Sequence, residues 1–151
     1  HGGHIVSYIG DSFLVVYGAP KKVEDHELLA VRSAMKMRDR LKEMNKKWDE
    51  DEFSRYWKNN GIGEIKARTG LHTGSVIAGN IGSERMLQYS TIGDVVNVAS
   101  RLEQANKKFD SNILISQEIY TTLTKDLYSL CEFKKEISLK GRETPTKVYS
   151  I

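Results

Sequence analysis

The chain has 151 residues, of which 39% are hydrophobic and 28% charged, a balance typical of one folded domain with a single core. Its formal charge of +3 comes from scattered basic residues without a run that would follow a nucleic-acid backbone, and Cys131 is the only cysteine. An internal disulfide and a cysteine-paired zinc site are therefore excluded. No apolar run is long enough to span a bilayer. We expect a cytoplasmic domain that binds a small anion, without nucleic-acid or membrane contact, although a parent protein could be anchored elsewhere.

Two short apolar runs at the amino end predict a β-hairpin. They cover residues 5–9 and 13–17, and the second is uniformly apolar, as in a strand that is buried on both faces. Gly10 and Asp11 between them favour a tight turn, which places the Asp11 carboxylate at the tip. Aspartate is a common turn residue, so the pattern alone leaves the role of Asp11 open.

The next part of the chain predicts a long helix, a connection and a strand. A core-facing stripe at helical spacing begins near Val23 and consists of Leu28, Val31, Met35, Leu41, Met44 and Trp48. The charged and aromatic residues 46–63 suit the frayed end of this helix and a loop. Alternation over 65–73 then predicts a strand.

Glycines and a histidine mark the segment that follows. Turns, bulges or close backbone approaches are expected at Gly70, Gly74, Gly79 and Gly82. His72 is expected to be a strand residue rather than a metal ligand, because no second ligand stands at a suitable spacing.

A helix with two different faces is predicted after a turn at Gly93 and Asp94, where the Asp94 side chain is expected to cap the first amides. At about 100° per residue, one face is apolar and contains Val95, Val98, Ala99 and Leu102. Asn97 and Arg101, four residues apart, share another face. An isolated polar pair of this kind usually faces solvent.

The carboxyl-terminal third predicts a strand at 113–116, a short helix from 117 to about 123, and a hairpin of residues 133–139 and 146–151. Lys140 stands at the start of the hairpin loop. Strands mixed with helices, without regular alternation, predict an α+β sandwich.

Four segments in this order resemble the catalytic domain of the class III nucleotidyl cyclases, the adenylate and guanylate cyclases. They are IGDSFLVVYGAP at 9–20, RTGLHTGSVIAGNIGSER at 68–85, YSTIGDVVNVASRLE at 89–103 and LKG at 139–141. Four ordered matches are far more specific than one glycine motif. The resemblance implies a ferredoxin-like cyclase sandwich over residues 1–151 that is N-terminally truncated, because the family's F-x-D-I strand, with its first metal aspartate, is absent.

The resemblance also implies the roles of individual residues. Asp11 would bind Mg²⁺ or Mn²⁺, two ions per site, Asn97 would orient the ribose, and Arg101 would stabilise the α-phosphate. Lys140 would contact the terminal phosphates. Ser7 and Ser90 align with the positions that select the purine; Ser90 resembles a threonine variant of bacterial adenylate cyclases and Ser7 matches neither type, which favours ATP over GTP.

In this family two catalytic domains pair head to tail, and the glycine-rich segment leads to an arm that packs on the second subunit. The resemblance thus implies a homodimer that converts ATP to 3′,5′-cyclic AMP and pyrophosphate at composite sites. Each site would join Asp11 of one subunit to Asn97, Arg101 and Lys140 of its partner. Without the upstream strand, the 151 residues alone are expected to be inactive, with exposed strand edges at 13–17 and 67–73.

Other functions stay open from the sequence. A catalytically silent module that binds nucleotide or only dimerises would suit the missing aspartate and Ser7, but it would not need Asp11, Asn97, Arg101 and Lys140 together. A guanylate cyclase is also compatible with these residues. A diguanylate cyclase is disfavoured because the chain has no GGDEF run.

Overall fold

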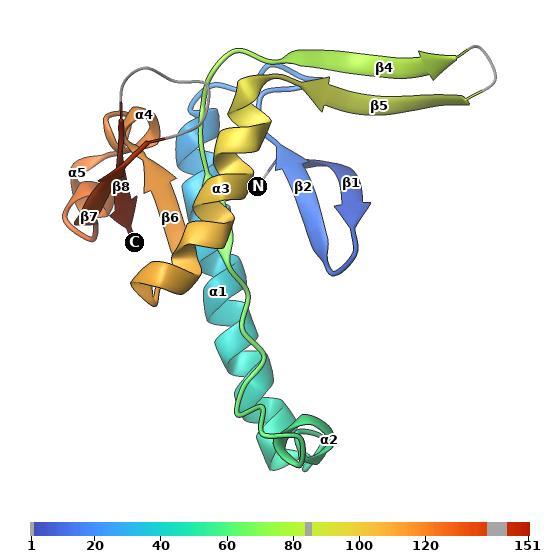
Figure 1. Ribbon diagram of the computed structural model, residues 1–151, viewed down its shortest axis with the longest axis vertical. Helices are drawn as coiled ribbons and strands as arrows, with labels where there is room; N and C mark the ends of the chain where they lie inside the picture. Colours follow the sequence, from blue (N-terminus) through green and yellow to red (C-terminus); the bar gives the residue numbers. More distant parts are fainter. Residues whose placement is uncertain (1, 84–85, 139–144) are drawn as a thin grey trace.

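The computed structural model describes residues 2–83, 86–138 and 145–151, and within them the strands form three sheets (Figure 1). The largest has the order β3-β6-β8-β7, which are Thr69–Leu71, Ile113–Ser116, Thr146–Ser150 and Glu132–Ile137. The other two are hairpins of β1 with β2 and β4 with β5, which are His4–Ile9, Ser12–Val16, Ile77–Ser83 and Met86–Ile92. The helices are α1 (His26–Glu50), α2 (Arg55–Lys58), α3 (Asp94–Phe109), α4 (Gln117–Tyr120) and α5 (Lys125–Tyr128). This mixture confirms the predicted α+β class.

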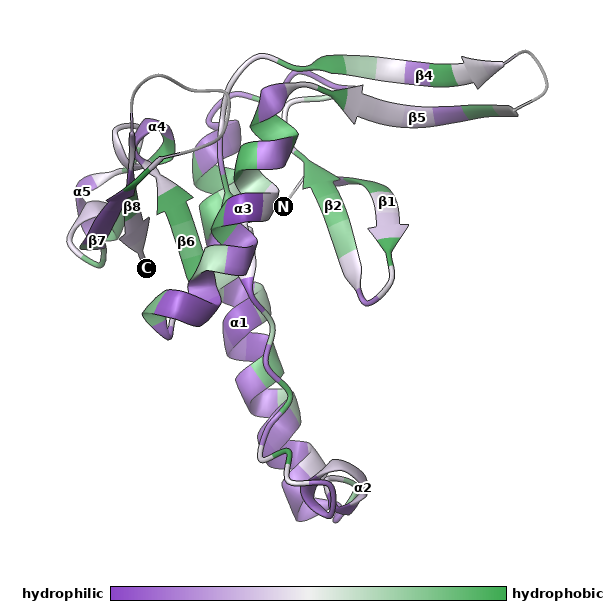
Figure 2. Ribbon diagram, in the orientation of Figure 1, coloured by the Kyte–Doolittle hydropathy of each residue, from purple (hydrophilic) through white to green (hydrophobic). Residues whose placement is uncertain are grey.

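Strand β6 is the centre of the fold because both of its faces are buried. Ile113 and Ile115 belong to one buried cluster with Val31 of α1, whereas Leu114 belongs to a second cluster with Leu102 of α3. Successive strand residues point to opposite faces, so the two helices cover the two sides of the sheet. Figure 2 shows β6 as a mainly hydrophobic strand, in keeping with this double burial.

Helix α1 differs from the prediction at both ends. It begins at His26 rather than near Val23, because Asp25 before it has a left-handed backbone with φ of 52°. It then continues to Glu50, into the stretch expected to fray. Its buried residues all lie in its first third: Ala30, Val31 and Ala34. The remaining part extends away from the sheets (Figure 1).

The far end of α1 carries a small lobe, where the sequence predicted a frayed helix end and a loop. Helix α2 packs back on α1 through Trp57 and Trp48, whose rings meet edge to face with centroids 5.6 Å apart. The returning chain is fixed by Asn45, whose Nδ2 donates to the Ile65 carbonyl at 2.8 Å while the Ile65 amide donates to Asn45 Oδ1 at 3.1 Å. We call residues 42–66 the α1–α2 lobe.

The predicted amino-terminal hairpin is confirmed. Ile9 pairs with Ser12, so Gly10 and Asp11 form the turn, and Gly10 takes a left-handed φ of 63° that glycine adopts without strain. The expectation that residues 13–17 are buried on both faces is wrong, because Phe13 is 49% exposed. No residue of β2 belongs to either buried cluster, and within the described residues β2 pairs only with β1.

The strand predicted over 65–73 is limited to β3, because only Thr69–Leu71 pair with β6. Gly70 lies in this strand, where its backbone closely approaches the backbone of α3. A close backbone approach was one of the roles predicted for this glycine. Gly79 and Gly82 form neither turns nor bulges, since both lie in the regular register of β4 with β5. Among the described residues, β3 is also an edge strand of its sheet.

The carboxyl-terminal elements largely follow the prediction. The strand at 113–116 has the expected bounds, and β7 and β8 form the expected antiparallel hairpin. The helix expected from 117 to about 123 already ends at Tyr120, and the short helix α5 was not predicted. In the part of the chain that the structure describes, no helix is both long and apolar enough to cross a bilayer.

A buried amide fastens α3 to the edge of the sheet. Asn106 is completely buried, and its Nδ2 donates to the carbonyl of Thr69 in β3 at 3.0 Å. The same nitrogen lies within hydrogen-bond distance of the Leu102 and Glu103 carbonyls, at 3.1 and 3.2 Å. Its Oδ1 accepts a hydrogen bond from Ser111 Oγ at 2.9 Å. The amide thus meets three acceptors on its nitrogen side and one donor on its oxygen side.

Asn106→Asp is therefore expected to destabilise the chain by about 3 kcal/mol at pH 7, because a carboxylate would face carbonyl oxygens without solvent. The measurement is urea-induced unfolding followed by circular dichroism. Gln104→Glu is the matched control, since it makes the same change of charge at an exposed position of α3, and it should alter stability by less than about 0.5 kcal/mol. Equal effects of the two variants would refute the structural role of Asn106.

Candidate active site

Helix α3 places one row of side chains in the core and another away from it. Val98 and Leu102 are fully buried, as their spacing predicted. On another side of the helix, Asn97 is exposed and Arg101 is half-buried. The buried row fixes the helix against β3 and β6, so the two polar side chains are carried by a well-anchored element.

The start of α3 differs from the prediction by one position. Gly93 is the N-cap residue and Asp94 is the first residue of the helix, so Asp94 does not occupy the capping position that was expected. Its carboxylate lies in the first turn, where the helix dipole favours a negative charge. Gly93 joins β5 directly to α3, so Ser90 in β5 and Asn97 in α3 lie on consecutive elements.

The Asp11 carboxylate lies at the exposed tip of the β1–β2 hairpin. In Figure 1 this tip points away from the rest of the domain and is well separated from α3. A single chain therefore does not bring Asp11 together with the polar side of α3 that carries Asn97 and Arg101.

Ser7 and Ser90 come from two strands that contact each other. Strand β1 packs against β5, where the rings of His4 and Tyr89 meet edge to face with centroids 5.1 Å apart. Ser7 follows a bulge in β1, Ser90 lies in β5 opposite Gly79, and both serines are half-buried. The structure thus brings together the elements that carry these two side chains. Lys140 lies outside the described residues.

The residues that the structure describes contain no group of three His, Cys, Asp or Glu side chains that could hold a metal ion. The exposed carboxylate of Asp11 nevertheless suits Mg²⁺, which keeps several waters and takes one or two carboxylates together with substrate phosphates. His72 follows β3, with a fully buried side chain whose Nδ1 lies 2.8 Å from Ser116 Oγ. The expectation that His72 is a strand residue is wrong by one position, because β3 ends at Leu71.

Sequence reasoning missed the residues that hold α3 in place. A Cβ atom on Gly70 would lie 2.1 Å from the Ala99 carbonyl oxygen and 2.3 Å from the Glu103 amide nitrogen, so only glycine admits this packing. From the side of the helix, Asn106 Nδ2 donates a hydrogen bond to the Thr69 carbonyl, next to Gly70 in β3. Asn106 lies four residues after Leu102 on the apolar side of α3, and this position could have identified it as a buried polar residue.

The fold defines a class: an α+β domain with a helix on each face of its main sheet and a polar row on one of these helices. A family model described as the adenylate and guanylate cyclase catalytic domain matches residues 1–151. The chain belongs to this family.

Individual relatives support the same assignment. Adenylate cyclase 1 of Rhizobium meliloti (strain 1021) is 32% identical over 151 residues, covering 100% of this chain and 21% of that protein. The adenylyl cyclase CyaB from P. aeruginosa has a TM-score of 0.74 at 30% identity, covering 99% of this chain and 71% of that one. The guanylyl cyclase Cya2 has a TM-score of 0.75 at 27% identity, covering 99% and 69%. The chain spans about a fifth of the length of the Rhizobium protein.

Proposed function

We propose that this chain is the catalytic part of a nucleotidyl cyclase that converts ATP, in preference to GTP, to 3′,5′-cyclic AMP and pyrophosphate. The observation that carries the proposal is the polar side of α3, which presents Asn97 and Arg101 away from a fully buried row of the same helix. Relatives that are named adenylate cyclase support the activity.

The reaction forms a bond between the ribose 3′-oxygen and the α-phosphorus and breaks the bond from that phosphorus to the pyrophosphate oxygen. The 3′-hydroxyl proton passes to solvent, and pyrophosphate leaves. Negative charge gathers on the α-phosphate oxygens during this exchange, and the planar guanidinium of Arg101 can donate several hydrogen bonds to them. Asn97, one turn earlier, would hold the ribose so that its 3′-oxygen faces the phosphorus.

Asp11 is the proposed protein ligand of Mg²⁺ or Mn²⁺, two ions per site in the full enzyme. A bound ion would lower the charge on the triphosphate and favour the ionised 3′-oxygen. The exposed position of Asp11 at a hairpin tip leaves room for a substrate triphosphate from a partner site. Lys140 is proposed to bind the terminal phosphates.

The separation of the Asp11 tip from α3 favours active sites that are shared by two copies of the chain. Each site would combine Asp11 of one copy with Asn97, Arg101 and Lys140 of the other. Asp11→Ala and Arg101→Ala chains should each be inactive alone and regain about a quarter of the wild-type activity when mixed equally, because half of the dimers then contain one intact site of two.

This complementation is measured as cyclic AMP formation by the complete protein with Mn²⁺ and ATP. The control is a mixture of two differently tagged Asp11→Ala chains, which should stay inactive. Mixed dimers that form, as shown by co-purification of the two tags, but that remain inactive would contradict a shared site. Absence of any cyclic nucleotide from the wild-type protein, despite bound nucleotide, would favour the silent module.

The purine preference is proposed to depend on Ser7 and Ser90. A serine hydroxyl both donates and accepts, so selection of ATP over GTP should be loose. Ser7→Lys is expected to increase the ratio of kcat/KM for ATP to that for GTP about tenfold, because a fixed donor suits the adenine ring acceptor and opposes the guanine ring N–H.

The measurement is the pair of kcat/KM values with each nucleotide. Ser7→Ala is the control, since it removes the hydroxyl without adding a donor and should not increase the ratio. A wild-type enzyme that already rejects GTP by several orders of magnitude would show that other residues select the base.

A further inference from the structure

The connection from β3 to β4, residues 72–76, lies against the first turn of α3. A Cβ atom on Gly74 would be 2.8 Å from Val95 Cγ2, and one on Gly93 would be 3.4 Å from the Ser75 carbonyl oxygen. In Figure 1 the connection passes the upper end of α3, where β5 leads into the helix. The place of this connection therefore determines where the first turn of α3 can lie.

Helix α1 holds the same connection through a hydrogen bond. Thr73 Oγ1 donates to Glu27 Oε1 at 3.0 Å, and His26 Nε2 lies 3.1 Å from the same oxygen. The Glu27 side chain is only 18% exposed and belongs to the first turn of α1. The buried residues of α1 follow directly in its first third, so the acceptor is carried by the well-anchored part of that helix.

Strand β6 holds the connection at the preceding residue. His72 Nδ1 lies 2.8 Å from Ser116 Oγ at the end of β6, and both side chains are fully buried. Two successive residues, His72 and Thr73, are thus held by β6 and α1, and the next, Gly74, meets α3. The connection transmits the position of the core to the start of α3.

We propose that Thr73 and Glu27 are positioning residues for Asn97. The inference rests on the proposed function, in which Asn97 orients the ribose. Asn97 is the fourth residue of α3, so it belongs to the turn that the connection supports through Val95. Loss of the hydrogen bond would let this turn shift, and small displacements of an orienting group lower the rate of the chemical step. Thr73 and Glu27 themselves would not touch the nucleotide.

Thr73→Val tests the role because it removes the hydroxyl at almost constant volume. In the complete protein, kcat for ATP should fall about tenfold, and KM should change by less than about twofold. Thr73→Ser restores the hydroxyl and should recover most of kcat. Glu27→Gln keeps an oxygen that can accept the hydrogen bond, whereas Glu27→Ala should match Thr73→Val. A raised KM with unchanged kcat in Thr73→Val would overturn the proposal.

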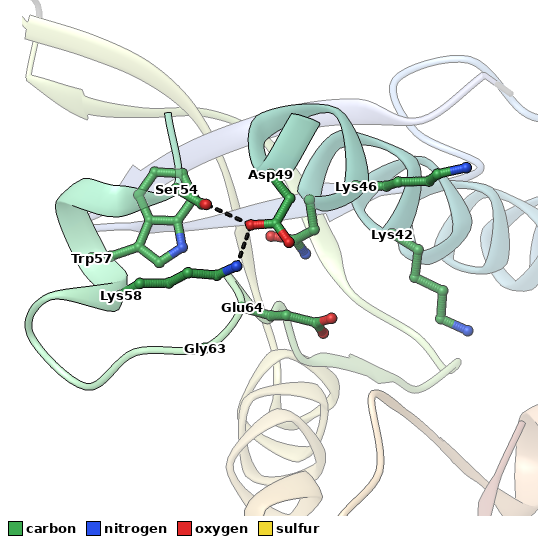
Figure 3. A pocket seen from close by; sticks show the side chains of 9 residues that line it. Lys42, Lys46, Asp49, Ser54, Trp57, Lys58, Gly63 and Glu64 are labelled. Atoms are coloured by element: carbon green, nitrogen blue, oxygen red, sulfur yellow. Dashed lines mark hydrogen bonds and ion pairs between the residues drawn. The ribbon is translucent and has the colours of Figure 1, made fainter. Parts of the chain in front are cut away.

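The control is a similar hydrogen bond at the other end of α1. Figure 3 shows Ser54 Oγ donating to Asp49 Oδ1, at 2.6 Å, within the α1–α2 lobe. Ser54 is only 4% exposed, so Ser54→Ala should lower the melting temperature at least as much as Thr73→Val. It should nevertheless leave kcat unchanged, because the lobe lies far from the start of α3 (Figure 1). An equal loss of kcat in Ser54→Ala would show general destabilisation and overturn the proposal.

A double variant shows whether Thr73 acts through Asn97. Added to Asn97→Ala, the Thr73→Val change should lower kcat by less than about a further twofold, because the group that it positions is already absent. A further tenfold loss would overturn the proposal.

Hydrogen exchange gives a measurement that does not depend on activity. The Val96 amide donates to the Gly93 carbonyl in the first turn of α3, at 3.2 Å. This amide should exchange about fivefold faster in Thr73→Val and at the wild-type rate in Ser54→Ala. Unchanged exchange in Thr73→Val, beside an active wild-type protein, would overturn the positioning role alone. A wild-type protein that forms no cyclic nucleotide would instead refute the proposed function, and this role with it.

Discussion

Replacing Gly70 by alanine is expected to destabilise the chain by more than about 4 kcal/mol, the range reached when backbone or core packing is directly blocked. The added methyl would lie 2.1 Å from the Ala99 carbonyl oxygen and 2.3 Å from the Glu103 amide nitrogen. Both atoms belong to the backbone of α3 and cannot turn aside as a side chain could. The helix would have to move off the sheet, with loss of the burial of Val98 and Leu102.

Thermal and urea unfolding measure this effect. Gly79→Ala is the matched control, because Gly79 also lies in a strand but a Cβ atom there meets nothing within 4 Å. The control should unfold like the wild-type chain, while Gly70→Ala should unfold at a far lower urea concentration or lack a cooperative transition. Similar midpoints for the two variants would show that α3 does not rest on Gly70 in solution.

Arg101→Ala in the complete protein is expected to lower kcat by a hundredfold or more, about 3 kcal/mol of transition-state stabilisation, with little change in KM. The physical reason is that the α-phosphate oxygens gain charge mainly in the transition state. Arg101 is half-buried on α3, so its guanidinium is held by a fixed element. Steady-state cyclase assays give both constants.

Two further variants sharpen the result for Arg101. Arg101→Lys keeps the charge but loses the planar set of donors, and it should recover only part of the lost kcat. Lys107→Ala changes an exposed basic residue of the same helix and should leave both constants unaltered. An unchanged kcat with a raised KM for Arg101→Ala would assign the arginine to ground-state binding instead.

Local patterns predicted the parts of the fold that local interactions determine. The strand at 113–116, the Gly10-Asp11 turn and the periodicity around Val98 and Leu102 all have short-range physical causes, and each is found in the structure. The fit of Gly70 against α3 joins segments some thirty residues apart, so no local pattern contains it. The α1–α2 lobe escaped prediction for another reason: the residues between Trp48 and Trp57 are mostly charged or polar and show no apolar periodicity that would indicate the contact of the two rings.

The candidate site was predictable only in part. Helical spacing placed Asn97 and Arg101 on a common polar side, and the structure confirms that placement. Their catalytic roles, and that of Asp11, rest on the family resemblance, because their proposed partners belong to a second copy of the chain. The sequence pattern of one chain cannot predict the geometry of a site that would form only when two copies pair.

The pairing of β3, β6 and β8 also has a kinetic consequence. Residues 69–71 pair with 113–115, and residues 114–116 pair with 148–150, so the central sheet requires the closure of long loops. The two-residue turn of β1 with β2 and the short connection of β4 with β5 require almost none. Loop closure slows folding as sequence separation grows. The hairpins and the start of α1 can therefore form early, whereas the buried centre, and with it the fixed position of α3, forms last.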